Sequence, residues 1–206
     1  MAGIILAGGR GKRLGVIDKA HYILAGRTLL DYVTAALAPV VDRLILVTNN
    51  PELHFDFPGE VVTDRHRSCG PLCGIEAGLI AAGEGLHFVT GCDMPFLNSE
   101  LISYLGQQGR NYDIVVPRLG HYVEPLHSFY RYNVLLQIKS QLKKANYKLS
   151  ALFTAPLQVL HVNENEIKKH DPDLISFFNI NTPADVQKAA KMLAHRGGQK
   201  WNQQQL

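Results

Sequence analysis

The sequence is poor in cysteine, with three in 206 residues: Cys69, Cys73 and Cys92. A chain of this length can bury a full core without disulfides, so we expect reduced thiols in a cytoplasmic protein. Cys69 and Cys73 are spaced closely enough for a metal clip. No second Cys or His pair completes a tetrahedral set, and a structural metal is therefore not expected.

Long apolar runs are also missing, since none approaches the ~20 residues that a membrane span needs. The N-terminal Met-Ala-Gly leads straight into an apolar stretch, without the basic start and cleavage site of a signal peptide. We therefore expect a cytoplasmic protein with no membrane partner.

Neither sign of charge dominates, because 21 Lys and Arg stand against 18 Asp and Glu, for a net charge of +3. This excess is too small to indicate a nucleic-acid partner. The basic residues are scattered except for a cluster near the N-terminus, which comprises Arg10, Lys12, Arg13 and Lys19. Because this cluster lies in a glycine-rich segment, it indicates a local anion site.

Apolar runs alternate with stretches of helical period along most of the chain. The apolar runs predict strands over residues 3–7, 44–47, 60–62, 86–91, 113–116, 126–130, 157–162 and 177–180. The stretches between them predict helices over 28–37, 72–82, 99–105, 133–144 and 183–193. Thr28 and Thr182 are suited to cap the first and last helix.

This order predicts an α/β fold, in which a mostly parallel sheet carries helices on both faces in a Rossmann-like three-layer α/β/α arrangement. We expect one domain over residues 1–194 and a polar, frayed tail over 195–206. Ligands of such sheets bind beyond the carboxyl ends of the strands, so the loops after the strands are informative.

The segment after the first predicted strand combines glycines with cations. It reads Leu6, Ala7, Gly8, Gly9, Arg10, Gly11, Lys12, Arg13, Leu14 and Gly15. Glycines permit positive φ and close approach of a ligand, so that consecutive N–H groups can form an anion-binding concavity. Arg13 adds a planar cation with several donors and Lys19 a point charge, and together they suit a triphosphate.

Known phosphate loops differ from this segment. No Gly-Lys-Ser/Thr ends it, and Leu14 stands where a dinucleotide fingerprint has its third glycine. A surface turn is the alternative, which the adjacent Asp18-Lys19 pair disfavours. Leu-Ala-Gly-Gly followed by Arg13, Gly15 and Asp18-Lys19 closely resembles the signature of molybdenum cofactor guanylyltransferases, within the nucleotidyltransferase superfamily. Sugar-nucleotide pyrophosphorylases share a looser form.

Two aspartates follow later predicted strands. Asp64 precedes Gly70-Pro71, which indicates either a tight loop over a ligand or a plain strand-to-helix connection. Asp93 ends an apolar run and is suited to hold Mg²⁺, which needs only one or two protein carboxylates beside phosphates; capping of the next turn is the alternative. The resemblance implies that Asp64 and Gly70 lie near base and ribose, and that Asp93 holds the metal.

Two motifs resemble the acceptor side of the same family. Where many members have His-Pro, this chain has Glu124-Pro125, so no acceptor role is assigned to Glu124, and His127 taken alone is a packed strand histidine. Alternation puts Asn179 and Asn181 on one face of the last predicted strand. The resemblance implies that this Asn-x-Asn-Thr-Pro segment contacts the pterin, with helix capping as the alternative for Asn181.

The resemblance covers residues 3 to about 189 and implies a fold of the nucleotide-diphospho-sugar transferase type. It implies that GTP and molybdenum-bound molybdopterin give the guanine dinucleotide cofactor and pyrophosphate, with Mg²⁺ as cofactor. The implied catalytic residues are Arg13, Lys19 and Asp93. The implied nucleotide-binding residues are Leu6, Ala7, Gly8, Gly9, Lys19, Asp64, Gly70 and Asp93. It also implies transient contact with molybdoenzymes or their chaperones.

Other functions remain as alternatives. Relatives that transfer CMP to this pterin tend to carry Leu-Ala-Ala-Gly, so Gly8 favours GTP over CTP. A sugar-1-phosphate nucleotidyltransferase would share the loop and the metal aspartate, but this chain is short and has no second carboxylate in a clear metal position. A non-catalytic nucleotide-binding or cofactor-delivery protein is the alternative of another class, which the presence of Lys19 and Asp93 disfavours.

Overall fold

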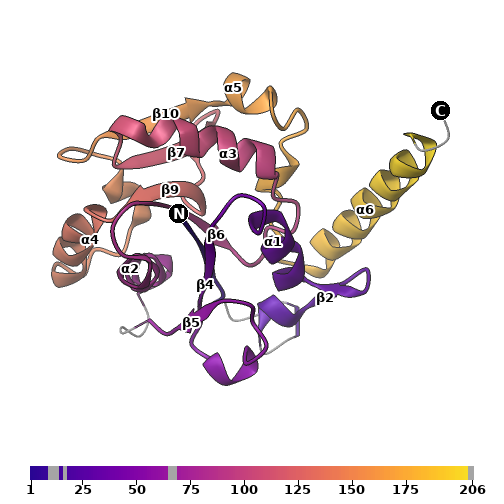
Figure 1. Cartoon of the computed structure of the whole chain (residues 1–206), viewed down its shortest axis with the longest axis horizontal. Coiled ribbons are helices and arrows are strands. Elements are labelled where there is room, and N and C mark those ends of the chain that lie inside the picture. Colours follow the sequence, from indigo (N-terminus) through magenta and orange to yellow (C-terminus); the bar gives the residue numbers. More distant parts are fainter. Residues whose placement is uncertain (9–13, 16–17, 65–68, 204–206) are drawn as a thin grey trace.

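The apolar run after Met1 forms the central strand of a sheet. In the computed structural model, which describes residues 1–8, 14–15, 18–64 and 69–203, β1 (Ala2–Leu6) lies between β4 (Arg43–Val47) and β6 (Leu86–Gly91) (Figure 1). All three strands run parallel. They are almost wholly buried, which explains why they are continuously apolar and do not alternate with polar residues.

The described residues extend this core to an eight-stranded sheet. Its other strands are β5 (Glu60–Val62), β7 (Ile114–Leu119), β8 (Tyr122–Val123), β9 (His127–Arg131) and β10 (Val159–Asn163). The order is β10-β7-β9-β6-β1-β4-β5, with β8 paired to β7. Strand β9 runs antiparallel to β6 and β7, while β10 and β5 pair in parallel with their neighbours. The mostly parallel sheet is thus confirmed.

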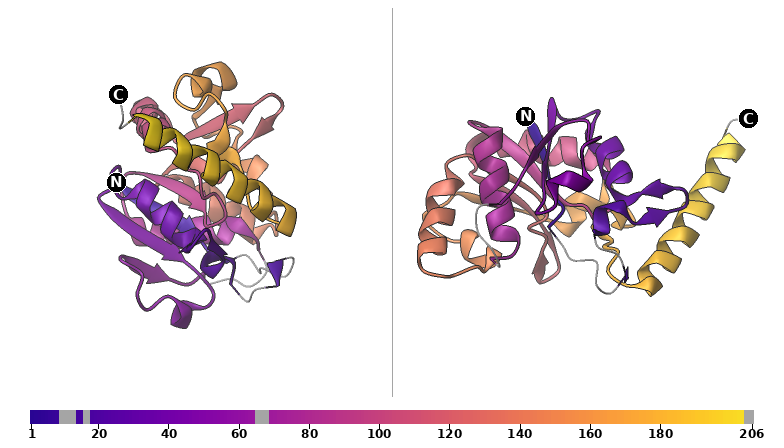
Figure 2. Two further views of the ribbon diagram at one scale, coloured as in Figure 1. Left: turned by 90° about the vertical axis from the view of Figure 1, so that its right-hand side faces the viewer. Right: turned by 90° about the horizontal axis from the view of Figure 1, so that it is seen from below.

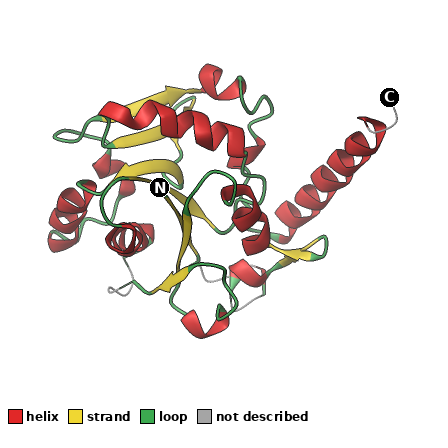
Figure 3. Ribbon diagram, in the orientation of Figure 1, coloured by secondary structure: helices red, strands yellow, loops and turns green. Residues whose placement is uncertain are grey.

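Helices cover both faces of the sheet (Figure 3). Ile5 and Leu46 pack on one face, against α1 (Leu29–Leu37) and α3 (Ser99–Gln108), with α5 (Glu164–Lys168) at the same core. Their neighbours Ile4 and Ile45 point to the other face, against α2 (Pro71–Ala82) and α4 (Val134–Lys143). Adjacent residues of a strand therefore pack in opposite core layers, because successive side chains of a strand point to opposite faces of the sheet.

Short elements complete the described chain. They are the hairpin β2 (Ile23–Leu24) and β3 (Arg27–Thr28), and the 3₁₀ turns η2 (Lys19–His21), η3 (Pro51–Leu53), η4 (Gly109–Asn111), η5 (Leu149–Leu152) and η6 (Ile175–Phe177). The hairpin turns through Ala25 and Gly26, both at positive φ. Within the described ranges, no helix is both long and apolar enough to span a membrane.

The last helix is longer than predicted. α6 (Pro183–Gln203) begins where Thr182 and Asp185 exchange capping hydrogen bonds, which confirms the predicted start. The predicted end at 193 and the frayed tail from 195 are wrong for the backbone up to residue 203, which continues as helix through Gly197 and Gly198. The helix extends away from the sheet beside the β2–β3 hairpin (Figure 2). The domain limit at 194 stays a prediction.

Two further expectations need correction. The predicted strand 177–180 is not a strand, because the Ile180 N–H donates to the Asp93 carbonyl (2.9 Å) outside any ladder. Cys69 and Cys73 are not reduced thiols, since they form a disulfide. Cys69 directly precedes the turn into α2, so the two Cα atoms lie 5.9 Å apart, within bridging range. Cys92 is a buried thiol, and burial raises its pKa.

Candidate active site

The loops after β1, β4, β5 and β6 meet at one edge of the sheet. Leu6 is paired with Gly91 at the ends of β1 and β6, and the Cys92 N–H continues the ladder by donating to the Leu6 carbonyl (3.1 Å). The Ala7 N–H donates to the Val47 carbonyl at the end of β4 (2.8 Å). The start of the glycine-rich segment and Asp93 therefore lie at the same, carboxyl-terminal edge, where α/β sheets bind ligands.

The described part of the glycine-rich segment is closely packed at its base. Ala7 is buried, and Leu6 lies against Gly74 of α2, where an added Cβ would come 3.1 Å from the Leu6 Cδ2 atom. Gly8 is exposed. Gly9 and Arg13 lie outside the described residues, so their predicted roles stay predictions. Helix α2 thus fixes the point at which the chain leaves β1.

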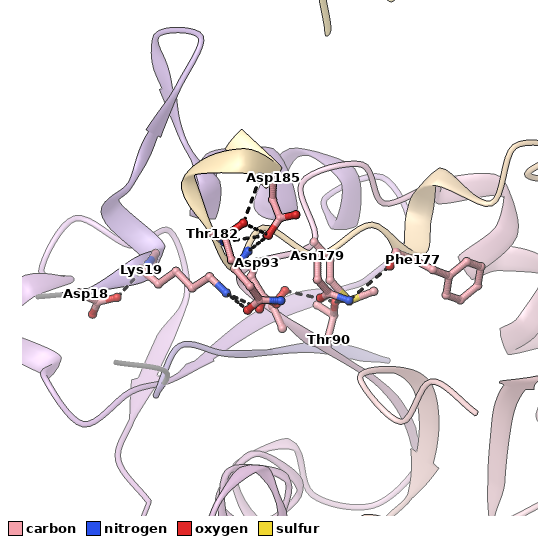
Figure 4. Close-up of polar contacts among 12 residues, drawn as sticks. Asp18, Lys19, Thr90, Asp93, Phe177, Asn179, Thr182 and Asp185 are labelled. Carbon is pink, nitrogen blue, oxygen red and sulfur yellow. Dashed lines mark hydrogen bonds and ion pairs between the residues drawn. The ribbon is translucent and has the colours of Figure 1, made fainter. Parts of the chain in front are cut away.

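Lys19 joins three distant parts of the chain. Its Nζ atom donates to the Asp93 Oδ2 atom (2.6 Å) and to the Asn181 Oδ1 atom (2.7 Å) (Figure 4). Lys19 is 8% exposed, while the Asp93 side chain keeps 22% of its surface open. This pairing brings the predicted catalytic lysine, the predicted metal ligand and a predicted acceptor residue into direct contact.

Backbone contacts place Asn181 in this cluster. The Ile180 N–H is anchored on the Asp93 carbonyl (2.9 Å). Asp185 caps α6 by accepting from the backbone N–H groups of Asn181 (3.0 Å) and Thr182 (2.8 Å). The Asn181 side chain is therefore not used as a cap and is free to face Lys19. The Asn179 side chain has another partner, because its amide donates to the Phe177 carbonyl (3.3 Å).

The second predicted motif lies at the same edge, further along the sheet. Asp64 follows β5, whose end is joined to β4 by a hydrogen bond from the Thr48 N–H to the Val62 carbonyl (3.0 Å). Gly70 precedes α2 with φ +64°, which favours glycine, and α2 begins with Pro71, whose ring suits the first turn of a helix. In the described chain no hydrogen bond or ion pair joins Asp64 or Gly70 to Lys19.

Glu124 and His127 are both buried. Glu124 accepts from the Leu126 N–H (3.0 Å) and the Tyr122 hydroxyl (3.1 Å), and burial, aided by the charge of Asp93, raises its pKa. His127 lies against Phe88, and burial lowers its pKa to about 3. A neutral imidazole with apolar neighbours confirms that His127 is a packed strand histidine.

The sequence interpretation missed one residue of this region, His54. It follows η3 in the loop after β4, and its Nε2 atom lies 2.9 Å from the Asp18 Oδ2 atom. A signal was present, because the carboxyl ends of parallel strands carry the ligand-binding loops. The predicted elements nevertheless gave no reason to connect a loop histidine with Asp18.

The donor set at Asp93 fits a small, hard cation. A carboxylate oxygen of Asp93 and the amide oxygen of Asn181 already converge on one cation, the Lys19 ammonium. Magnesium takes oxygen ligands of this kind and completes its shell with phosphate oxygens and water. No group of three or more His, Cys, Asp or Glu able to hold a metal occurs among the residues described.

The paired Lys19 and Asp93 lie at the carboxyl edge of the parallel strands, where α/β sheets bind their ligands. The model of the MobA-like NTP transferase domain matches residues 3–159, and the chain belongs to this family. It is accordingly a nucleotidyltransferase. The family resemblance of the sequence motifs is thereby confirmed.

Comparisons with individual proteins support the same family. The chain is 36% identical over 190 residues to a molybdenum cofactor guanylyltransferase of Desulfosudis oleivorans, covering 92% of this chain and 94% of that protein. It is similar to the crystal structure of molybdopterin-guanine dinucleotide biosynthesis protein A from Archaeoglobus fulgidus, with a TM-score of 0.84, 28% identity and coverage of 95% and 100%. A cytidylyltransferase from Thermus thermophilus, at 17% identity and TM-score 0.68 over 93% and 98% of the two chains, shares the fold.

Proposed function

We propose that this protein transfers GMP from GTP to molybdenum-bound molybdopterin, forming the guanine dinucleotide cofactor and releasing pyrophosphate. The observation that carries the proposal is the Lys19 ammonium held between Asp93 and Asn181 at the edge where the glycine-rich segment begins. The names of the relatives above support guanine as the base and molybdopterin as the acceptor.

The reaction requires mainly that the two phosphates are positioned and that the developing negative charge is stabilised. The terminal phosphate of the pterin forms a bond to the α-phosphorus of GTP, while the bond from that phosphorus to pyrophosphate breaks. The attacking phosphate is already ionised near neutral pH, so no general base is required. Lys19 would offset the negative charge that develops on the oxygens of the reacting phosphate.

Magnesium is the proposed cofactor, held by Asp93 and the amide oxygen of Asn181. When bound, it supplies charge neutralisation at the phosphate oxygens and a template for the leaving pyrophosphate. Lys19 would then donate to phosphate oxygens in place of Asn181. Its flexible stem permits this change of partner, which a rigid guanidinium would restrict.

We propose that the residues predicted from the sequence contact the nucleotide and the acceptor. Leu6, Ala7, Gly8, Asp64 and Gly70 lie at one sheet edge, and we propose that they surround the base and ribose. Asn181 and Asn179 would face the acceptor from the segment before α6. Arg13 and Gly9 are proposed to bind the phosphates. A cytoplasmic location and contact with molybdoenzymes or their chaperones complete the proposal.

The test measures products with the purified chain, Mg²⁺ and molybdenum-bound molybdopterin. Formation of the guanine dinucleotide with equimolar pyrophosphate, from GTP but not CTP or ATP, supports the proposal. Asp93→Asn should abolish turnover, whereas Asp173→Asn, a change at an exposed carboxylate, serves as the matched control. GTP binding without pyrophosphate release would favour a delivery protein, and turnover with sugar 1-phosphates a pyrophosphorylase.

A further inference from the structure

His54 is a buried imidazole next to the proposed catalytic lysine. Its side chain is 0% exposed, and its Nε2 atom lies 2.9 Å from the Oδ2 atom of Asp18, whose side chain is 2% exposed. The two residues come from different loops, since Asp18 precedes η2 and His54 follows η3. A hydrogen bond buried this deeply fixes the relative positions of the two loops.

The partner of His54 organises the turn that carries Lys19. Asp18 is the N-cap of η2, and its Oδ1 atom accepts from the Ala20 N–H (2.9 Å). The carboxylate is thus held at both oxygens, by the turn at Oδ1 and by His54 at Oδ2. Lys19 is the first residue of this turn, and its backbone is set by the cap.

His54 also contacts the far end of the same turn. Its ring stacks on the ring of His21, the last residue of η2, with centroids 4.6 Å apart and planes 21° from parallel. The imidazole therefore holds both ends of a three-residue turn, by a hydrogen bond before Lys19 and by stacking after it.

The two ring nitrogens of His54 have different surroundings. A carboxylate only accepts hydrogen bonds, so Nε2 of His54 carries the proton that it donates to Asp18. The Nδ1 atom is buried without a hydrogen-bond partner in the described chain. An unpaired polar atom in the interior is costly, so packing alone gives no reason for a histidine at this position.

We infer that His54 is a positioning residue for Lys19, an inference that rests on the proposed function in giving Lys19 a catalytic role. A lysine side chain has large rotamer freedom, so its aim depends on a fixed backbone. Misplacement of a reacting group by about 1 Å can cost ~100-fold in rate.

A matched pair of amides tests this role. His54→Gln can place an amide N–H near the position of Nε2 and should keep kcat within about 3-fold of wild type. His54→Asn is shorter, leaves the Asp18 Oδ2 atom unpaired, and should lower kcat by ~10- to ~100-fold with a smaller change in KM for GTP. In a Lys19→Ala background, His54→Asn should lower kcat no further, because the two residues act as one unit.

His87→Asn is the structural control. His87 is also buried, but it bonds the backbone of Ala2 and Gly83 at the opposite edge of the sheet. It should lower stability while kcat per folded molecule stays unchanged. The inference is overturned if His54→Asn and His87→Asn reduce kcat equally, if Gln fails to rescue, or if the losses from His54→Asn and Lys19→Ala multiply.

A second readout does not depend on activity. Reductive methylation of Lys19, followed by mass spectrometry with the other lysines as internal reference, reports how firmly the ammonium is held. Methylation of Lys19 should be several-fold faster in His54→Asn than in wild type, His54→Gln or His87→Asn. Equal rates in all four proteins overturn the inference. Faster labelling of His54→Asn in a protein that forms no dinucleotide would sustain the positioning role and reject the proposed function.

Discussion

Acidification should destabilise this protein through His127, beyond the usual titration of carboxylates. The ring is fully buried, and neither nitrogen has a hydrogen-bond partner among the described residues. Its ring neighbours are Phe88 and Phe177, with centroids 5.1 and 4.7 Å away. An imidazolium here would lose its hydration without compensation, which lowers the pKa from 6.5 to about 3.

The sign of the effect follows from this lowered pKa. The unfolded chain binds a proton at His127 near pH 6.5, while the folded protein does not until about pH 3. The contribution to stability is therefore fully present above pH 6.5 and is lost as the pH falls toward 3. Between pH 7.5 and 5.0 only the unfolded state titrates at this site. At ~1.4 kcal/mol per pH unit, the loss amounts to about 2 kcal/mol.

Urea unfolding of wild type and His127→Leu at pH 7.5, 6.0 and 5.0 isolates this contribution. Leucine fills a similar space and leaves no unpaired nitrogen. His87 and His161 also have lowered pKa values, but they are present in both proteins and cancel in the difference. As the pH falls from 7.5 to 5.0, the free energy of unfolding of the variant minus that of wild type should rise by about 2 kcal/mol. Parallel pH dependences of the two proteins would refute the reasoning.

Two further predictions concern the active site and the thiols. Lys19→Ala and Asp93→Ala should each lower turnover at least ~100-fold, the scale of losing one preorganised charged group, as measured by pyrophosphate release; near-normal rates in either variant would contradict its role. After unfolding without a reductant, alkylation and mass spectrometry should find only Cys92 modified, because Cys69 and Cys73 are joined; modification of all three would show that the disulfide is absent.

Local signals in the sequence predicted much of the fold. Thr28 caps α1 through a reciprocal bond with Asp31, and Thr182 caps α6, because capping depends on residues within one turn. The buried parallel strands were also found, since β1 and β4 are continuous apolar runs. Such features are fixed by neighbours in the chain.

Features that depend on distant partners were harder to predict. The run 177–180 has the composition of a strand, yet it bonds the Asp93 carbonyl and leaves the sheet. The β2–β3 hairpin was missed because its turn places Ala25, a residue with a Cβ, at φ 48°. His54 has no motif of its own, and only the folded chain shows that it reaches Asp18.

The charges of the described site support the proposal that Mg²⁺ is the cofactor. Lys19 is paired with Asp93, and the Asp18 Oδ2 atom lies 2.9 Å from the His54 Nε2 atom. Glu124 is a third carboxylate, whose pKa is raised by burial, and it adds no positive charge. The described part of the site therefore offers little net positive charge to a triphosphate, which brings several negative charges. We propose that Mg²⁺ at Asp93 and the basic residues around Arg13, which lie outside the described residues, together supply the balance. We propose that the Lys19 ammonium occupies the cation position between Asp93 and Asn181 when no metal is bound.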